Sequence, residues 1–179
     1  MLGYISAQGR GNADRLLAEL AHRLTAASWP LAGVVQINRE TTQGRPCDMD
    51  LQVIGQSHHI RISHSLGPHA SGCRLDAHGL ETAVGLVAAT LDARPALLIL
   101  NKFGKAEAEG RGFRSVIGQA LAQDIPVLTA VRQPNMNMFL AFADGMAEAL
   151  PVDICALQDW CCEQTGRTVQ TVSLERTIP

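Results

Sequence analysis

The sequence predicts an α/β protein built on a mostly parallel sheet with helices on both faces. Two continuously apolar segments, residues 95–100 and 125–131, have the composition of strands that are buried on both faces. Segments with apolar residues at helical spacing lie between the strand candidates, as at residues 13–27 and 76–93. This alternation favours parallel strands joined by crossover helices, which gives three layers.

The first half of the chain contains one break from that alternation. Residues 49–63 form two short runs around a Gly-Gln-Ser turn, which predicts an antiparallel hairpin with His58, Ile60, Ile62 and His64 on one face. The expected elements before it are a strand at 1–7, a glycine turn at 8–12, a helix at 13–27, a strand at 30–37 and a loop at 41–48.

The second half returns to the regular pattern. Asp76 is placed to cap the helix at 76–93, and Gly166 to close the terminal helix. The other expected elements are a strand at 95–100, a loop at 101–112, a helix at 113–123, a strand at 125–131, a helix at 136–150, a short strand at 152–155, a helix at 156–166 and an edge strand or tail at 167–179.

Composition narrows the classes of function. A length of 179 residues suits one domain, here expected to span 1–179. A net charge of −2 and only two Trp, one Tyr and four Phe argue against nucleic acid as a partner. The chain shows no signal peptide and no apolar run long enough to span a membrane, so no membrane insertion and a cytoplasmic location are expected. Five cysteines without a CxxC pair predict reduced thiols.

Both lysines of the chain, Lys102 and Lys105, lie in one segment, residues 97–113. They follow a buried strand, and the glycine turn at 8–12 follows another. Ligands of parallel sheets bind beyond the carboxyl ends of the strands, so the two loops are expected to face one another across a site. The alternative is that both ammonium groups are solvated loop charges.

These segments resemble the P-loop nucleotide-hydrolase fold, and within it the small nucleoside-triphosphatase family of thermophilic archaea and bacteria. Gly104, Lys105 and Glu107 match that family's late motif, whereas Asn101 and Lys102 stand where it has an acidic pair. The chain also resembles, over its whole length, a bacterial family of unknown function often encoded beside molybdate-transport genes. The shared signatures are Gln-Gly-Arg-Gly, Gly-Cys-Arg-Leu-Asp and Asn-Lys-Phe-Gly-Lys.

The sequence differs from a working phosphate loop at several positions, and these differences determine which ligand chemistry we expect. Such a loop needs a lysine on the β and γ phosphates and a hydroxyl on magnesium. Gly9 and Gly11 are too close together for that motif, and neither the lysine nor the hydroxyl follows them. Asn101 and Lys102 also change the local charge of the late motif from about −2 to about +1. The sequence therefore predicts degenerate nucleotide-hydrolysis motifs and no metal ion.

A glycine turn that enters a helix still presents free N–H groups and the positive end of a dipole. With the nearby cations, this predicts a small-oxyanion site, and the resemblance favours molybdate or tungstate. No cofactor beyond such an anion is predicted. The residues expected to bind the anion are Gln8, Gly9, Arg10, Gly11, Asn12, Ala13, Asn101, Lys102, Lys105, Arg111 and Arg114.

Two other functions stay open. One is a nucleoside-triphosphatase with re-sited catalytic groups, in which Glu107 positions water. The other is a non-catalytic module that binds a protein partner in molybdenum or nitrogenase-cofactor supply. The motif departures favour a binding protein over an enzyme, and a homo-oligomer is compatible with each of these functions.

Three further groups of residues allow a functional or a structural interpretation. The histidines between His58 and His78 have ligand chemistry, but their spacing favours polar hairpin and loop positions over a metal site. Cys73 precedes a helix start, which can activate a thiol, although no histidine is identifiable as its base. Arg132, Asn135 and Asn137 could line the ligand crevice or cap the next helix.

Overall fold

A computed structural model describes residues 1–9, 11–39, 47–57, 59–64 and 74–169. The strands in these ranges are β1 (Leu2–Ile5), β2 (Leu31–Arg39), β3 (Asp48–Val53), β4 (His59–Arg61), β5 (Leu97–Phe103), β6 (Val127–Val131) and β7 (Ala147–Ala149). The helices are α1 (Asn12–Ala26), α2 (Ala77–Thr90), the short 3-10 helix η1 (Leu91–Ala93), α3 (Lys105–Ala108), α4 (Arg114–Ala122), α5 (Gln133–Ala143) and α6 (Ile154–Thr165).

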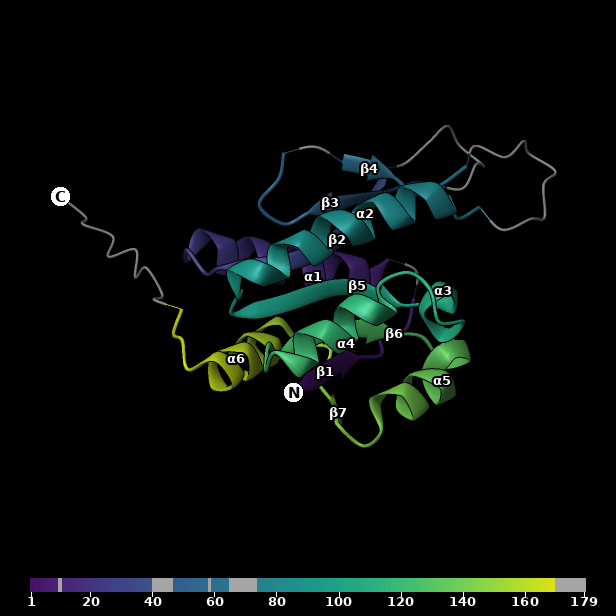
Figure 1. Ribbon diagram of the computed structural model, residues 1–179. Helices are drawn as coiled ribbons and strands as arrows, with labels where there is room; N and C mark the ends of the chain where they lie inside the picture. The colour runs from purple at the N-terminus through teal and green to yellow at the C-terminus, as the bar shows by residue number, and fades with distance from the viewer. Residues whose placement is uncertain (10, 40–46, 58, 65–73, 170–179) are drawn as a thin grey trace.

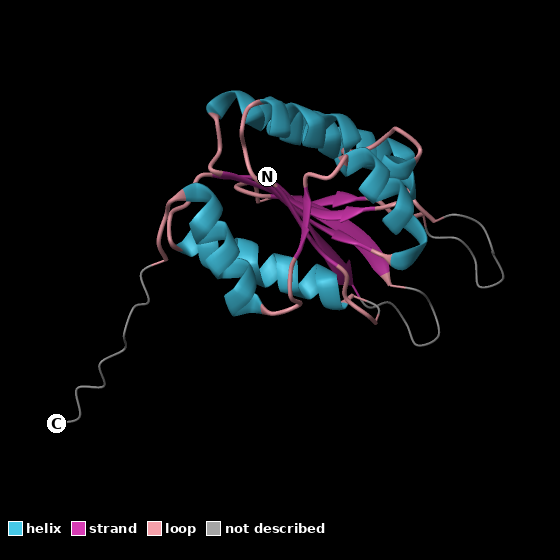
Figure 2. Cartoon of the chain, turned by 90° about the horizontal axis from the view of Figure 1, so that it is seen from below, coloured by secondary structure: helices cyan, strands magenta, loops and turns pink. Residues whose placement is uncertain are grey.

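The strands form one sheet in the order β4-β3-β2-β5-β6-β1-β7. The pairs β2–β5, β5–β6, β6–β1 and β1–β7 are parallel, whereas β3 is antiparallel to both β2 and β4. Helices cover both faces of the sheet, as Figure 2 shows with the helices in cyan and the strands in magenta. The expected three-layer α/β class with an inserted antiparallel hairpin is confirmed, and it is consistent with a P-loop-like fold.

Each face of the sheet has its own hydrophobic core. On one face, α1 and α6 pack Leu17, Leu20 and Trp160 against the sheet. On the other face, α2, α4 and α5 contribute residues such as Val87 and Phe139. Figure 1 shows α2, α4 and α5 along the strands on that second face. Because the sheet is covered on both sides, a polar side chain on a central strand is accessible only near a strand end.

The prediction for residues 147–155 was wrong. The expected helix at 136–150 ends at Ala143, because Asp144 (φ 45°) and Gly145 (φ 79°) adopt left-handed conformations. Residues 147–149 then form β7, which pairs with β1 along Leu2–Tyr4. The expected strand at 152–155 is absent, since the Asp153 side chain accepts a hydrogen bond from Ala156 N and caps α6.

Several local predictions are confirmed. The Asp76 carboxylate accepts hydrogen bonds from His78 N and Gly79 N at the start of α2. Gly166 closes α6 in a left-handed conformation with φ 64°. The expected loop at 101–112 was wrong in two places: β5 continues to Phe103, so Asn101 and Lys102 lie on the strand, and Lys105–Ala108 form the single-turn helix α3. The predictions for the loop at 41–46, His58, Cys73 and residues 170–179 fall outside the described residues.

No helix among those described has the length and apolar character needed to cross a membrane.

Candidate functional site

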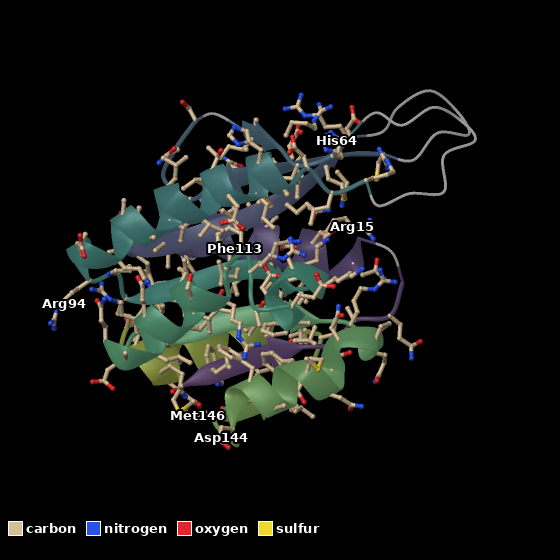
Figure 3. All side chains as sticks on the ribbon, turned by 45° about the vertical axis from the view of Figure 1, so that its right-hand side comes forward. Arg15, His64, Arg94, Phe113, Asp144 and Met146 are labelled. Atoms are coloured by element: carbon tan, nitrogen blue, oxygen red, sulfur yellow. The ribbon has the colours of Figure 1, made fainter. Side chains whose placement is uncertain are left out.

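A cavity of about 630 Å³ opens at the carboxyl ends of the parallel strands. It lies beside the start of α1, and it is lined by the segment that follows β1, by the last residues of β2, β5 and β6, and by Arg132 after β6. In Figure 3, Arg15 marks this end of the strands, and Arg94, which precedes β5, lies at the opposite end. The lining residues are Ala7, Gly9, Gly11, Ala13, Asp14, Arg15, Ala18, Gln36, Ile37, Asn38, Cys47, Met49, Lys102, Ala130 and Arg132.

The glycine turn shapes one wall of this cavity. Gly9 and Gly11 have φ values of 87° and 78°, in the left-handed region that favours glycine. Gly11 is the N-cap of α1, and as a glycine it has no side chain to accept from the N–H groups of the first turn. Asn12 donates to the carbonyl of Gln8 at 2.7 Å and accepts from Arg15 Nη2 at 2.7 Å. Among the described residues, no side chain caps the first-turn N–H donors of α1.

Asp14 is the centre of a network of amide side chains. Its Oδ1 accepts a hydrogen bond from Asn101 Nδ2 at 2.9 Å. Its Oδ2 accepts one from Asn38 Nδ2 at 2.7 Å and a long one from Gln36 Nε2 at 3.4 Å. Gln36 also donates to Asn38 Oδ1 at 2.7 Å. The network joins α1 to β2 and β5 and fixes the floor of the cavity.

The side chain of Asn101 takes the place of a backbone hydrogen-bond acceptor between β2 and β5. The parallel pairing of β2 and β5 runs as far as Val34 and Leu100. Beyond it, Gln36 N donates to Asn101 Oδ1 at 3.1 Å, so a side chain takes over where the ladder ends. Asn101 is only 2% exposed, and its hydrogen bonds meet the requirement that a buried amide be paired.

Among the described residues, positive side chains outnumber negative ones around the cavity. Arg15, Lys102 and Arg132 line it from α1, β5 and the N-cap of α5, and Asp14 is the acidic residue among them. The formal charge of these described lining residues is therefore positive. The sequence left two roles open for Arg132: lining the crevice or capping the next helix. The structure places Arg132 in the wall of the cavity.

The other predicted cations do not join this cavity. Lys105 lines a separate cavity of about 110 Å³, together with Asn101 and Lys102, and its Nζ lies 3.7 Å from Glu109 Oε1. Arg111 pairs with Glu109 and lines neither cavity. The Arg114 guanidinium lies 4.4 Å from the centroid of the Phe142 ring and donates to the Glu107 carbonyl. Arg10 falls outside the described residues.

Glu107 organises the loop that follows β5. The residue is 4% exposed, and its two carboxylate oxygens accept hydrogen bonds from Gly104 N at 2.9 Å and Phe113 N at 3.1 Å. It lines the smaller cavity and not the larger one. These contacts indicate a structural role for the carboxylate, because both oxygens already have backbone donors.

The sequence reasoning missed Asp14, Arg15, Gln36 and Asn38 as lining residues. The sequence did contain a pattern that predicts the two amides. Gln36 and Asn38 are two residues apart at the end of an apolar strand, so their side chains lie on the same face of the sheet near the carboxyl end of that strand. No comparable signal marked Asp14, because an acidic residue in the first turn of a helix is common for electrostatic reasons alone.

Metal and thiol chemistry find little support in the described part of the chain. No group of three or more His, Cys, Asp or Glu side chains there is placed to hold a metal ion. Cys47 lines the larger cavity, and its Sγ lies 4.0 Å from Asn38 Oδ1. Burial raises the pKa of the Cys161 thiol to about 12, which keeps it protonated and unreactive.

The sheet and the cavity define the class of protein: an α/β protein whose fold is consistent with a P-loop-like one, with a cavity lined by polar and charged residues at the strand ends. Residues 2–160 match the family described as "Protein of unknown function (DUF2478)", and the chain belongs to that family. This confirms the predicted resemblance to a family of unknown function.

A relative with a printed function also matches. Over 156 residues the chain is 35% identical to the molybdenum import ATP-binding protein ModC 2 of Bradyrhizobium diazoefficiens. The match covers 86% of this chain but only 17% of that protein, so the chain spans about a sixth of the relative's length. No solved structure matches the chain. The relationship to the thermophile family and the molybdate gene neighbourhood stay predictions.

Proposed function

We propose that the protein binds a small oxyanion in the 630 Å³ cavity, with molybdate and tungstate as the first candidates. The observation that carries this proposal is that Arg15, Lys102 and Arg132, from three elements, line the cavity beside the start of α1. Their positive charges attract an anion, and the half-buried Lys102 is less screened by solvent than the two exposed arginines. The similarity to a molybdenum import protein supports molybdate over other oxyanions.

The turn and the cations have complementary roles in this proposal. Gly9 and Gly11 let the backbone approach the ligand, and the first-turn N–H groups of α1 supply directional donors. Lys102 and the two arginines neutralise the charge of the ligand. Arginine suits this role because its fork of N–H donors matches two oxygens of an oxyanion.

The nucleotide alternative uses the same cavity. A volume of about 630 Å³ lies within the range of small-molecule sites, so size does not exclude a nucleotide. However, Asn12 and Ala13 follow Gly11 where a phosphate loop has its lysine and hydroxyl. Glu107 points away from the cavity into its own loop. These features favour anion binding over magnesium-dependent hydrolysis.

Thermal unfolding with added ligands tests the proposal. A ligand that binds only the folded state at about 100 times its Kd stabilises it by about 2.7 kcal/mol, which raises the Tm by roughly 5–10 °C. We expect such a rise with molybdate or tungstate and none with ATP and magnesium. A rise with ATP and magnesium alone would replace the proposal with the nucleotide alternative.

Two lysine variants locate the site. Lys102→Met removes a cation from the cavity wall and should abolish most of the rise. Lys105→Met is the matched control, because Lys105 is 80% exposed, pairs with Glu109 and lines the other cavity. An equal loss of the rise in both variants would point to nonspecific charge attraction and not to this site.

A further inference from the structure

The smaller cavity, of about 110 Å³, has an apolar interior. Val34 lines it from β2 and Ala106 from α3, and Phe113, labelled in Figure 3, lines it from the N-cap of α4. The other apolar lining residues are Leu51, Ile62, Leu75 and Leu80. Protein interiors are close-packed, and voids larger than a water molecule are few. A hollow of this size and lining can therefore accept a compact apolar group.

The cavity lies where the pairing of β2 and β5 ends. The parallel ladder stops at Val34 and Leu100, and beyond it Gln36 N donates to Asn101 Oδ1. The loop after β5 closes the cavity, and Glu107 holds that loop through hydrogen bonds from two backbone N–H groups. The Asn101 amide and the Glu107 carboxylate thus have protein partners already, and both belong to a preformed wall.

Two lysines mark the solvent side of the cavity. Val34 and Phe113 are 1% and 3% exposed, whereas Lys102 is half-buried and Lys105 is exposed. Lys105 Nζ lies 3.7 Å from Glu109 Oε1 and is well solvated. Lys102 is the less screened of the two charges, because solvent surrounds it less completely. An apolar interior with a cation at its mouth is complementary to a ligand with an apolar tail and an anionic head.

We propose that the smaller cavity is a second binding site, for a small carboxylate with a branched apolar tail whose head pairs with Lys102. A dry cavity of about 150 Å³ admits benzene, so about 110 Å³ admits roughly four carbon atoms. Lys102 and Gln36 line both cavities, so the carboxylate head lies beside the proposed oxyanion site. The inference rests on the smaller cavity and holds whether or not the larger one binds an oxyanion.

Three small molecules test the proposal, with binding to the wild-type protein followed by NMR titration. Isovalerate carries a four-carbon branched tail and a carboxylate, acetate lacks the tail, and 3-methyl-1-butanol lacks the charge. We expect isovalerate to bind with a Kd of about 1 mM or tighter. Acetate and the alcohol should each bind about tenfold more weakly or worse. Equal affinities for isovalerate and acetate, or for isovalerate and the alcohol, would overturn the proposal.

A filled cavity gives a second test. Ala106→Leu places a larger side chain in the cavity wall and should abolish isovalerate binding. Ala108→Leu is the matched control, because Ala108 lies on the same helix and lines neither cavity. It should keep the wild-type affinity. Isovalerate binding that survives Ala106→Leu unchanged would place the ligand elsewhere and contradict the proposal.

The lysines are tested in the same way. Lys102→Met should weaken isovalerate about tenfold, whereas Lys105→Met should change its affinity less than about threefold. The reverse order would overturn the pairing with Lys102.

One measurement needs no variant. Nuclear Overhauser contacts between the isovalerate methyl groups and the Phe113 ring should appear in the wild-type protein, because Phe113 lines the cavity. Contacts confined to residues outside the smaller cavity would overturn the proposal. Molybdate titrations judge the oxyanion function separately, since a molybdate ion has no tail to fill this cavity. The Ala106→Leu variant should bind isovalerate no longer and molybdate as before.

Discussion

Asn101 both takes over at the end of a strand pairing and holds Asp14, a residue of the cavity wall. Its oxygen accepts from Gln36 N, and its nitrogen donates to Asp14 Oδ1. An acidic residue at this position would present oxygens alone and could not donate to Asp14. The amide of Asn101 is therefore suited to the presence of Asp14 in the first turn of α1.

Glu107 illustrates the opposite case, a residue whose chemistry suggests catalysis and whose contacts indicate structure. Its oxygens accept hydrogen bonds from the N–H groups of Gly104 and Phe113, which close the loop between β5 and α4. Gly112 belongs to the same arrangement, because a Cβ there would lie 2.3 Å from Glu107 Oε1. The loop is therefore built around the buried carboxylate.

We predict that Glu107→Gln destabilises the protein by about 1–3 kcal/mol, because the amide turns an N–H group toward a backbone N–H that needs an acceptor. Urea denaturation followed by circular dichroism measures this. Glu109→Gln is the control, because its ion pairs with Lys105 and Arg111 are exposed to solvent, so its urea midpoint should stay near that of the wild type. Equal stabilities of Glu107→Gln and wild type would contradict the structural role.

At the scale of elements, the segment after α5 shows the limit of periodicity. Apolar residues at helical spacing continue past Ala143, so the sequence predicted one helix to residue 150. The structure ends the helix at Asp144 and pairs residues 147–149 with β1. Three residues have little strand preference of their own, and the pairing partner lies more than a hundred residues away in sequence. Only the assembled sheet makes β7 a strand.

The contact between β2 and β5 depends on Gly33. This glycine has a φ of 122°, and a Cβ at its position would lie 1.8 Å from the carbonyl oxygen of Ile99. We predict that Gly33→Ala lowers the free energy of unfolding by more than about 3 kcal/mol, through backbone strain and a clash with backbone atoms. Chemical denaturation measures the loss.

Gly118→Ala is the matched control for that prediction. Gly118 lies within α4, and a Cβ there meets no atom within 4 Å. Alanine should therefore stabilise the helix by about 0.5–1 kcal/mol. A Gly33→Ala variant as stable as the Gly118→Ala variant would show that β2 and β5 do not pack as closely as the structure places them.

At the scale of the whole molecule, one sheet separates two cores. Both tryptophans, Trp29 and Trp160, belong to the core beside α1 and α6. Leu100 points from β5 into the core on the other face. Tryptophan fluorescence therefore reports on the core beside α1 and α6, whereas far-UV circular dichroism reports on the secondary structure of the whole fold. Comparing the two signals tests whether the two cores unfold together.

We predict a single cooperative transition, because the central strands contribute side chains to both cores. Leu20→Ala and Leu100→Ala, one in each core, should each cost about 2–5 kcal/mol. Each variant should shift the fluorescence and dichroism midpoints in urea equally. A Leu100→Ala variant whose fluorescence midpoint stays unchanged while its dichroism midpoint falls would show that the faces unfold independently.

The sequence by itself determined the class of fold, most strand and helix positions, the Asp76 and Gly166 helix ends, and the absence of a lysine and a hydroxyl after the glycine turn. These features depend on neighbours a few residues apart, so local patterns predict them. Only the tertiary structure decided which side chains meet at the cavity. Asp14 meets Gln36 across 22 residues and Asn101 across 87. Such contacts depend on strand order and register, which local patterns do not encode. The folded loop after β5 also leaves Lys105, Arg111 and Arg114 outside the larger cavity that Lys102 lines.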